Sequence, residues 1–177
     1  MFKLNNETSE LCGIISGDGH LSRDLSNGRN TYRVEIVGNN KEDLDYLNTV
    51  REMFHSQFGK TPKIRFLKNY MSIYFYSKEI LEFFENIVVI VGKKSSKIYI
   101  PEQIKTNKNL TFSFLRGLAD TDFNISFKKG DRKNNSYPRI VIELASEIMI
   151  EDIKNVLDKL SITYYAKKKL KHTNFGK

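Results

Sequence analysis

Hydrophobic positions along the chain follow helical spacing in some segments and strict alternation in others. Apolar residues three and four apart predict helices over residues 6–17, 41–57, 78–90, 112–121 and 147–160. Alternating apolar and polar residues predict strands over residues 20–25, 31–37, 63–68, 70–76, 123–129, 137–145 and 162–171. In the second of these strands Val34 and Ile36 share one face, and Arg33 and Glu35 share the other. This pattern is typical of a sheet with one buried and one solvated face.

The order of these elements repeats along the chain. A helix, two strands, a helix, two strands and a helix occupy residues 1–91, and Asn40 is the predicted N-cap of the second helix. Residues 92–109 form a linker, and residues 110–177 hold a second, C-terminally incomplete round of the same order. We therefore expect an α+β fold of two related halves, of which the second is shorter. The last predicted strand, 162–171, would be an exposed edge through which two chains could pair, although we expect a monomer.

The first helix of each predicted half carries a similar stretch of sequence. Residues 11–19 read LCGIISGDG, and residues 115–123 read LRGLADTDF. Each stretch is an apolar helical run that ends in an acidic turn, with Asp18 and Asp122 at the matching position. A single copy is better explained as an ordinary helix-ending turn, because glycine and aspartate are common there. Two copies, one in each half, favour a pair of half-sites that face each other.

Small residues mark one face of both of these helices. Gly13 and Gly17 are four residues apart and therefore lie on the same face, and Gly117 and Thr121 match them in the second copy. Glycine lets another backbone approach closely, so we expect the two helices to pack almost backbone to backbone. Their C-terminal ends would then lie side by side, with unpaired carbonyl groups and partial negative charge. With the two aspartates added, this oxygen-rich site would attract a hard divalent cation such as Mg²⁺.

Both stretches resemble the LAGLIDADG motif, also called the dodecapeptide or DOD motif, of homing endonucleases. Two motifs in one chain are similar to the archaeal single-chain type of this family. The residues that carry the resemblance are Leu11, Gly13, Ile14, Ile15, Gly17, Asp18 and Gly19, then Leu115, Gly117, Leu118, Asp120 and Asp122, with Gly92, Lys94, Ile98, Ile100 and Pro101 ahead of the second copy. Ser16 and Phe123 depart from the motif. The resemblance implies two pseudo-symmetric αββαββα halves, with the motif helices packed at the centre and the antiparallel sheets forming a DNA-binding saddle.

The same resemblance implies a function. It predicts a site-specific, Mg²⁺-dependent endonuclease, in which Mn²⁺ can substitute, that makes double-strand breaks at a long asymmetric DNA target in intron or intein mobility. The implied metal ligands are Asp18, Asp122 and the backbone carbonyl groups of Gly17 and Thr121. Lys94 and Asn39 are candidate catalytic assistants, although a structural role for Lys94 remains an alternative. The same scaffold also serves cleavage-deficient DNA-binding proteins and intron RNA-splicing maturases, which are the alternative functions.

Basic and aromatic residues on the polar faces of the strands and in the loops are candidates for nucleic-acid contact. Each Lys or Arg alone is better explained as an ordinary solvated charge, but their clustering on sheet surfaces suits the binding of a phosphate backbone. The candidate DNA-binding residues are His20, Arg23, Arg29, Arg33, Lys63, Arg65, Tyr74, Lys128, Arg132, Arg139, Lys167 and Lys169.

Composition agrees with a polyanionic partner but does not identify it. The 177 residues include 29 Lys and Arg against 21 Asp and Glu, a net charge of +8, which suits nucleic acid or an acidic membrane surface. Cys12 is the single cysteine, which excludes an internal disulfide and a zinc site of the paired-cysteine type. The N-terminus lacks the apolar core of a signal peptide, and the longest aliphatic run, residues 87–91, is too short to span a bilayer. We therefore expect a soluble cytoplasmic protein that does not enter a membrane.

Overall fold

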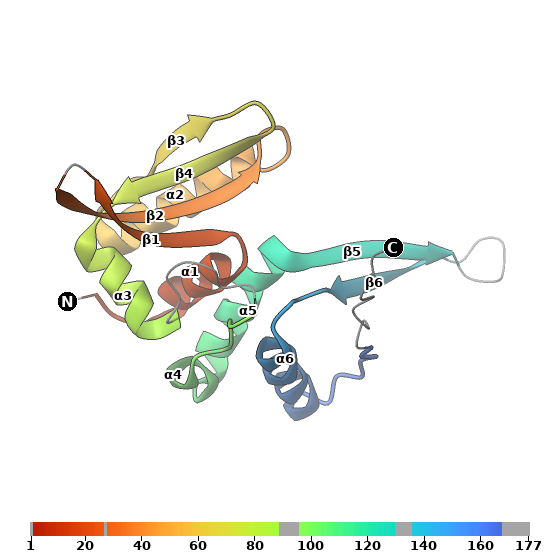
Figure 1. Cartoon of the computed structure of the whole chain (residues 1–177). Helices are drawn as coiled ribbons and strands as arrows, with labels where there is room; N and C mark the ends of the chain where they lie inside the picture. The colour runs from red at the N-terminus through yellow and green to blue at the C-terminus, as the bar shows by residue number, and fades with distance from the viewer. Residues whose placement is uncertain (1, 27, 89–95, 130–135, 168–177) are drawn as a thin grey trace, which may run out of the picture.

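The computed structural model describes residues 2–26, 28–88, 96–129 and 136–167, and it has the predicted α+β architecture (Figure 1). Two antiparallel sheets extend from opposite sides of a central pair of helices. The elements in chain order are α1 (Asn6–Gly17), β1 (Gly19–Ser26), β2 (Arg29–Asn39), α2 (Leu44–Phe58), β3 (Lys63–Phe66), β4 (Tyr70–Tyr76), α3 (Lys78–Val88), α4 (Glu102–Lys105), α5 (Lys108–Asp122), β5 (Phe123–Lys129), β6 (Ser136–Ile142) and α6 (Glu147–Lys159).

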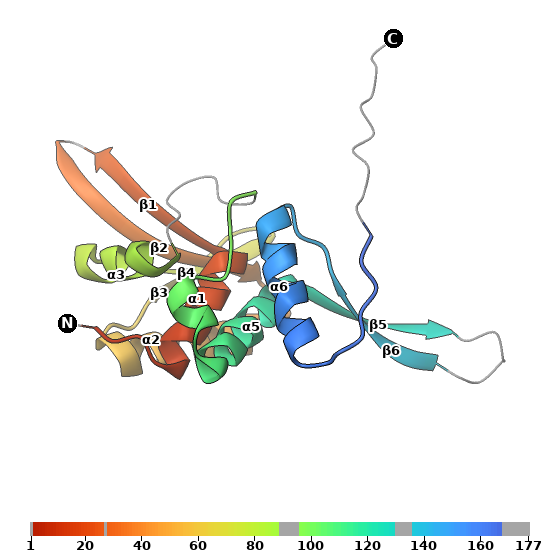
Figure 2. The same cartoon turned by 90° about the horizontal axis from the view of Figure 1, so that it is seen from below.

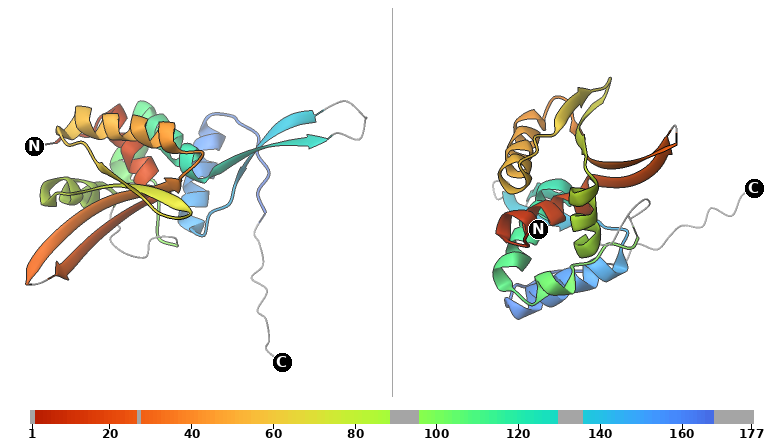
Figure 3. Two further views of the ribbon diagram at one scale, coloured as in Figure 1. Left: turned by 90° about the horizontal axis from the view of Figure 1, so that it is seen from above. Right: turned by 90° about the vertical axis from the view of Figure 1, so that its left-hand side faces the viewer.

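The first sheet has the strand order β1-β2-β4-β3, with every neighbouring pair antiparallel. Its register aligns Val34 with Leu21 and Phe75, and all three side chains are buried. Helices α2 and α3 pack on this face (Figure 3), where the ring centroid of Phe54 lies 5.1 Å from that of Phe75 and 6.1 Å from that of Phe84. Alternation thus gives the sheet one face in the core and one face turned away from it.

The second sheet consists, among the described residues, of the β5–β6 hairpin. The hairpin projects away from the helices (Figure 1), and the side chains of Ile125, Phe127 and Ile140 are 68%, 69% and 69% exposed. Helix α6 instead packs nearer the centre through Met149 and Ile153, which are buried. The second half therefore carries an apolar sheet face that no described helix covers in the way that α2 and α3 cover the first.

The linker contributes to this central packing. Ile98 and Ile100 are buried, the Ser146 hydroxyl donates a hydrogen bond to the Ile98 carbonyl group at 2.6 Å, and the Ile100 N–H donates to the Asp152 carboxylate at 2.9 Å. Residues 98–101 are thereby fixed against the start and the middle of α6. The sequence-matched positions Gly92 and Lys94 lie outside the described residues.

Several predicted boundaries are wrong. Helix α2 begins at Leu44 rather than at residue 41, because the Asn40 amide donates to the carbonyl groups of Leu67 and Lys68 instead of capping the helix. Helix α5 begins four residues earlier than expected, because the Asn107 side chain accepts hydrogen bonds from two backbone N–H groups of its first turn. The short helix α4 was not expected.

The predicted strand over residues 162–171 does not form in its described part. Residues 162–167 have no strand conformation, and residues 168–171 lie outside the described part of the chain. The preceding strand also stops at Ile142, three residues short of its predicted end. Alternating side chains are insufficient for a strand because the backbone hydrogen bonds require a partner.

Candidate functional site

Helices α1 and α5 lie side by side at the centre of the molecule (Figure 2). A Cβ atom built on Gly13 would lie 2.0 Å from the Phe114 carbonyl oxygen, and one built on Gly117 would lie 2.1 Å from the Glu10 carbonyl oxygen. Real Cβ atoms essentially never come closer than 3.0 Å to another heavy atom. The two backbones are therefore in direct contact, and only glycine fits at these two positions.

Polar contacts between α1 and α5 fix the register of the two helices. Glu10 of α1 is 8% exposed and forms an ion pair with Arg116 of α5. The neighbouring residue Ser9 donates a hydrogen bond from its hydroxyl to the Leu110 carbonyl group at 2.7 Å. Because Ser9 and Glu10 are both buried, loss of either partner would be costly, and these contacts set the register of the two helices.

The two motif aspartates lie at the adjoining C-terminal ends of this helix pair. A Cβ atom built on Gly17 would lie 1.9 Å from the Thr121 hydroxyl oxygen and 3.0 Å from a carboxylate oxygen of Asp122. Asp18 follows Gly17 directly and is the C-cap of α1, with its N–H bonded to the Ile14 carbonyl group. The structure therefore brings Asp18, Asp122, Gly17 and Thr121 together at one point.

The backbone around Asp18 is held on both sides. Its own carbonyl group accepts a hydrogen bond from Val37 of β2 at 3.3 Å, so the end of α1 is tied to the first sheet. Asp122 is the last residue of α5, and β5 begins at the next residue. Each aspartate thus sits at the junction between a central helix and the first strand of its half.

A small cavity of about 120 Å³ opens beside this point. Its lining includes Asp18, Asp43, Asp120 and Tyr46, and the Tyr46 hydroxyl is buried with no hydrogen-bond partner among the described residues. Burial raises the pKa of Tyr46, and the charge of Asp120 adds to this, so the phenol stays neutral. Desolvation, followed by the nearby Glu10 carboxylate, also raises the pKa of Asp120. Three aspartates thus line the cavity beside the motif ends.

The donors at the helix ends are hard oxygen atoms, which suit Mg²⁺. Two carboxylates, from Asp18 and Asp122, adjoin the carbonyl groups that terminate α1 and α5. Among the described residues no three His, Cys, Asp or Glu side chains are grouped to bind a metal. A cation here would therefore need backbone carbonyl groups, water and an external oxygen ligand such as a phosphate, and the site would be open to a substrate.

The predicted nucleic-acid contacts fall on both faces of the first sheet. Strand register places His20, Arg33, Lys63, Arg65 and Tyr74 on the face turned away from the core. Arg23 of β1 is the exception, because it lies on the helix-covered face, opposite Tyr32 of β2. There it stacks over the Tyr32 ring and forms an ion pair with Glu85 of α3.

The remaining predicted contacts are more dispersed. Arg139 lies on β6 opposite Ser126, and Lys167 is exposed beyond α6. Asn39 ends β2, where its side-chain oxygen accepts a hydrogen bond from the Lys41 N–H at 2.9 Å. Arg29 and Lys128 lie in β2 and β5, whereas Lys94, Arg132 and Lys169 lie outside the described residues.

The sequence patterns do not single out Glu35 on the outer face of the first sheet or Tyr46 in the cavity beside the motif ends. Glu35 is 8% exposed on the outer face of β2 and bonds to two arginines, and Tyr46 reaches the acidic cavity from α2. Alternation places Glu35 on the correct face but gives no sign of its burial. Helical spacing gives no sign that Tyr46 approaches the motif ends.

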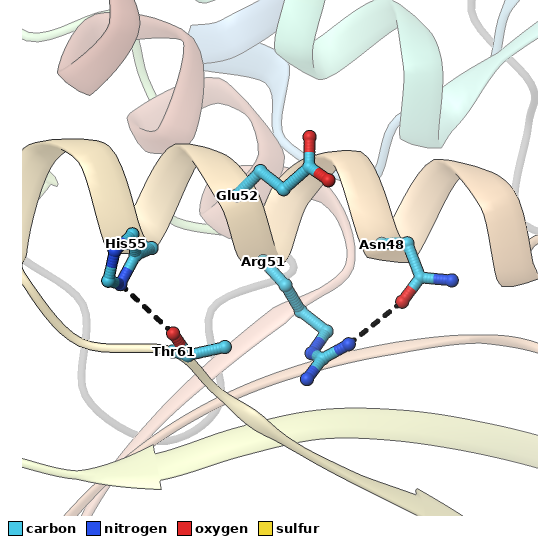
Figure 4. A pocket seen from close by; sticks show the side chains of 5 residues that line it. All are labelled: Asn48, Arg51, Glu52, His55 and Thr61. Atoms are coloured by element: carbon cyan, nitrogen blue, oxygen red, sulfur yellow. Dashed lines mark hydrogen bonds between the residues drawn. The ribbon is translucent and has the colours of Figure 1, made fainter.

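A larger hollow of about 450 Å³ lies along α2 (Figure 4). Arg51 donates to the Pro62 carbonyl group and to Asn48, and the Thr61 hydroxyl lies 3.1 Å from the His55 ring nitrogen. Four of its five lining residues thus bond to one another or to backbone, and no motif residue lines it. No helix in the described parts of the chain is long and apolar enough to cross a membrane.

Comparison with solved structures finds homing endonucleases. I-DmoI in complex with DNA and Ca aligns with 88% of this chain and 72% of its own, at 18% identity and a TM-score of 0.59. The meganuclease I-SmaMI bound to uncleavable DNA aligns with 94% of this chain and 76% of its own, at 16% identity and a TM-score of 0.56. This is the fold of the LAGLIDADG homing endonucleases.

The LAGLIDADG likeness is one of architecture. A structure of mesophilic I-DmoI variants aligns with 67% of this chain and 59% of its own, at 19% identity and a TM-score of 0.52, so the match spans about three fifths of that relative's length. No family model and no curated protein sequence matches the chain. At identities this low the structural alignments establish the LAGLIDADG fold, and any activity has to be argued from the residues of this chain.

Proposed function

We propose that the chain is a site-specific, metal-dependent DNA endonuclease that makes double-strand breaks at a long asymmetric target. The observation that carries the proposal is the position of Asp18 and Asp122 at the adjoining ends of two helices whose backbones touch. Support comes from solved relatives of the same fold, which include I-DmoI in complex with its target DNA in the presence of Mn and of Mg.

The chemistry that we propose follows from the donor set. Asp18, Asp122 and the carbonyl groups of Gly17 and Thr121 would hold Mg²⁺, or Mn²⁺ in its place. When bound, such an ion activates water and neutralises charge on a phosphodiester. The contribution of the chain is to fix both carboxylates on rigid helix ends and to leave the remaining coordination positions open. Asn39, at the end of β2, and Lys94, which lies outside the described residues, are proposed assistants.

Duplex DNA is the proposed partner, and the target is proposed to be asymmetric because the two halves differ. The first sheet offers Arg33, Arg65 and Lys63 on its outer face, while the second offers Arg139 on a two-stranded hairpin. Two such surfaces within one chain suit a monomer with pseudo-two-fold symmetry. Mobility of an intron or an intein is the biological setting that we propose for such cleavage.

The test is double-strand cleavage of a randomised DNA library with Mg²⁺. Asp18→Asn and Asp122→Asn should each abolish double-strand breaks while duplex binding is kept. Asp45→Asn, which neutralises an exposed acid in the first turn of α2, is the matched control and should cut as the wild type does. Unchanged cutting by both motif variants would overturn the site assignment.

A second candidate is a protein of the same scaffold that binds DNA, or a folded intron RNA, without cleavage. Among the described residues the second sheet has two strands against four in the first, and this favours the second candidate because a narrower sheet offers less surface for a duplex. Duplex binding without cleavage in Mg²⁺ or Mn²⁺, or tighter binding to intron RNA than to duplex DNA, would select this candidate.

A further inference from the structure

One acidic side chain sits within the basic outer face of the first sheet. Glu35 on β2 is 8% exposed, and one of its carboxylate oxygens accepts hydrogen bonds from Arg33 at 2.6 Å and from Arg65 at 3.1 Å. The two arginines come from different strands, β2 and β3, that are separated in the sheet by β4. A single carboxylate oxygen therefore joins two guanidinium groups across three strands.

Tyr74 holds the same two arginines from another side. Its ring lies on β4, directly opposite Glu35, and the guanidinium carbons of Arg33 and Arg65 lie 5.2 Å and 5.7 Å from its centroid. The Arg33 side chain is 21% exposed, whereas that of Arg65 is 45% exposed. Arg33 is thus the inner member of the cluster, and Arg65 is the more exposed one.

This arrangement suits recognition of a base better than recognition of a phosphate. A carboxylate beside two guanidinium groups lowers their net charge and repels a phosphate, so it weakens the attraction that basic faces usually provide. Holding the guanidinium planes in place, however, reduces the conformational freedom lost when they bind a ligand. Arginine with a fixed planar fork is the residue that reads guanine through O6 and N7 in the major groove. A twisted β-ribbon can enter that groove.

We propose that Glu35 is a positioning residue that fixes Arg65, with Arg33 behind it, for base-specific recognition of guanine in the major groove. The proposal rests on duplex binding, the first part of the proposed function, but not on cleavage. The cluster lies on the paired strands β2, β4 and β3, and Arg65 comes from β3, the edge strand of the sheet, rather than from a loop. The effect of Glu35 should appear as preference for one base at few positions and not as overall affinity.

The experiment selects bound sequences from a randomised duplex DNA pool in the presence of EDTA, so that cleavage plays no part. The full chain and its Glu35→Gln, Arg65→Ala and Arg65→Lys variants are compared, with salt-dependent binding measured for each. The wild type should enrich guanine at one or two positions, and each variant should lose that preference by about tenfold or more. Binding of Glu35→Gln to non-specific duplex should be equal or tighter, because a negative charge is removed from the face.

Two further variants separate positioning from charge and from folding. Asp24→Asn removes an exposed acid from the same face of β1 and should leave the guanine preference unchanged. Glu35→Asp keeps the charge but withdraws the carboxylate by one methylene, so it should hold the two arginines less firmly, and the guanine preference should weaken at unchanged net charge. This variant, with thermal unfolding measured alongside, carries the test if Glu35→Gln fails to fold.

Distinct results would overturn the inference. An unchanged guanine preference in Glu35→Gln or Glu35→Asp means that Glu35 does not position the reading group. A uniform loss of affinity in Arg65→Ala, with the salt slope reduced by about 1 and no change in base preference, means that Arg65 binds a phosphate. Absence of duplex binding by the wild type removes the proposed function together with this inference, whereas binding without cleavage leaves the inference standing.

Discussion

Replacing Gly13 with alanine should separate the two motif helices. The new Cβ atom would lie 2.0 Å from the Phe114 carbonyl oxygen and 2.8 Å from the Leu118 nitrogen. Both are backbone atoms, so no side chain can rotate out of the way. The first distance must grow from 2.0 Å to at least 3.0 Å, which requires the helices to move apart by about 1 Å.

The cost can be worked from this overlap. Overpacking against a rigid neighbour costs about 3 kcal/mol at the upper end of its usual range, and alanine returns about 1 kcal/mol through its better helix propensity. The net loss of about 2 kcal/mol should lower the melting temperature by about 4–8 °C for a chain of this size. If the motif carboxylates separate by a similar distance, cleavage should fall about a hundredfold.

Urea unfolding of Gly13→Ala measures the first effect, and cleavage of a selected target measures the second. Gly38→Ala is the matched control, because its Cβ would meet only side-chain atoms of Asp43 and Leu47, at 3.0–3.1 Å, so the overlap is much smaller than at Gly13. Wild-type stability of Gly13→Ala, or a loss no greater than that of Gly38→Ala, would refute the backbone contact between the motif helices.

Other changes test the surroundings of this contact. Arg116→Met should cost about 1–2 kcal/mol in urea unfolding at neutral pH, because it leaves the buried Glu10 carboxylate without its ion pair, and unchanged stability would contradict that pairing. The pKa of Asp120 is raised in the folded state, so its ionised form disfavours folding, and this penalty appears as the pH rises through the folded pKa. Asp120→Asn should therefore stabilise the protein at pH 7 but not at a pH below the ordinary aspartate pKa, and an equal effect at both would be inconsistent with the raised value. Ile36→Ala should cost about 2–5 kcal/mol, whereas Ile125→Ala on the exposed hairpin face should stay within about 0.5 kcal/mol, and comparable losses would mean that the hairpin face is covered in solution.

The sequence predicts best what depends on nearby residues. The helix expected over residues 6–17 is α1, Asn6–Gly17, because its apolar spacing is a local signal. The alternation of Met71, Ile73 and Phe75 likewise predicts the buried face of β4, since side chains two apart in a strand share a face. These features require no knowledge of the partner elements.

Features that depend on distant residues were missed or misread. Asn40 is a suitable helix cap by type, but its amide bonds to backbone 27 and 28 residues away. Glu35 is buried where it bonds to Arg65, 30 residues later, and lies opposite Tyr74 of the neighbouring strand. The alternation in residues 162–167 is compatible with a strand, yet no strand forms there. For Asn40 and Glu35 the deciding contact is made across the fold.

The contact between the motif helices also has a consequence for how such a protein can diverge. At Gly13 and Gly117 the two helices touch through backbone atoms. No side chain lies between them there, so a change of rotamer cannot alter the distance between the helices or between Asp18 and Asp122. Residues of the outer sheet faces are under no such restriction, and their replacement leaves the helix pair untouched. The outer faces of the sheets can therefore change by natural variation or by engineering while the separation of Asp18 and Asp122 stays the same.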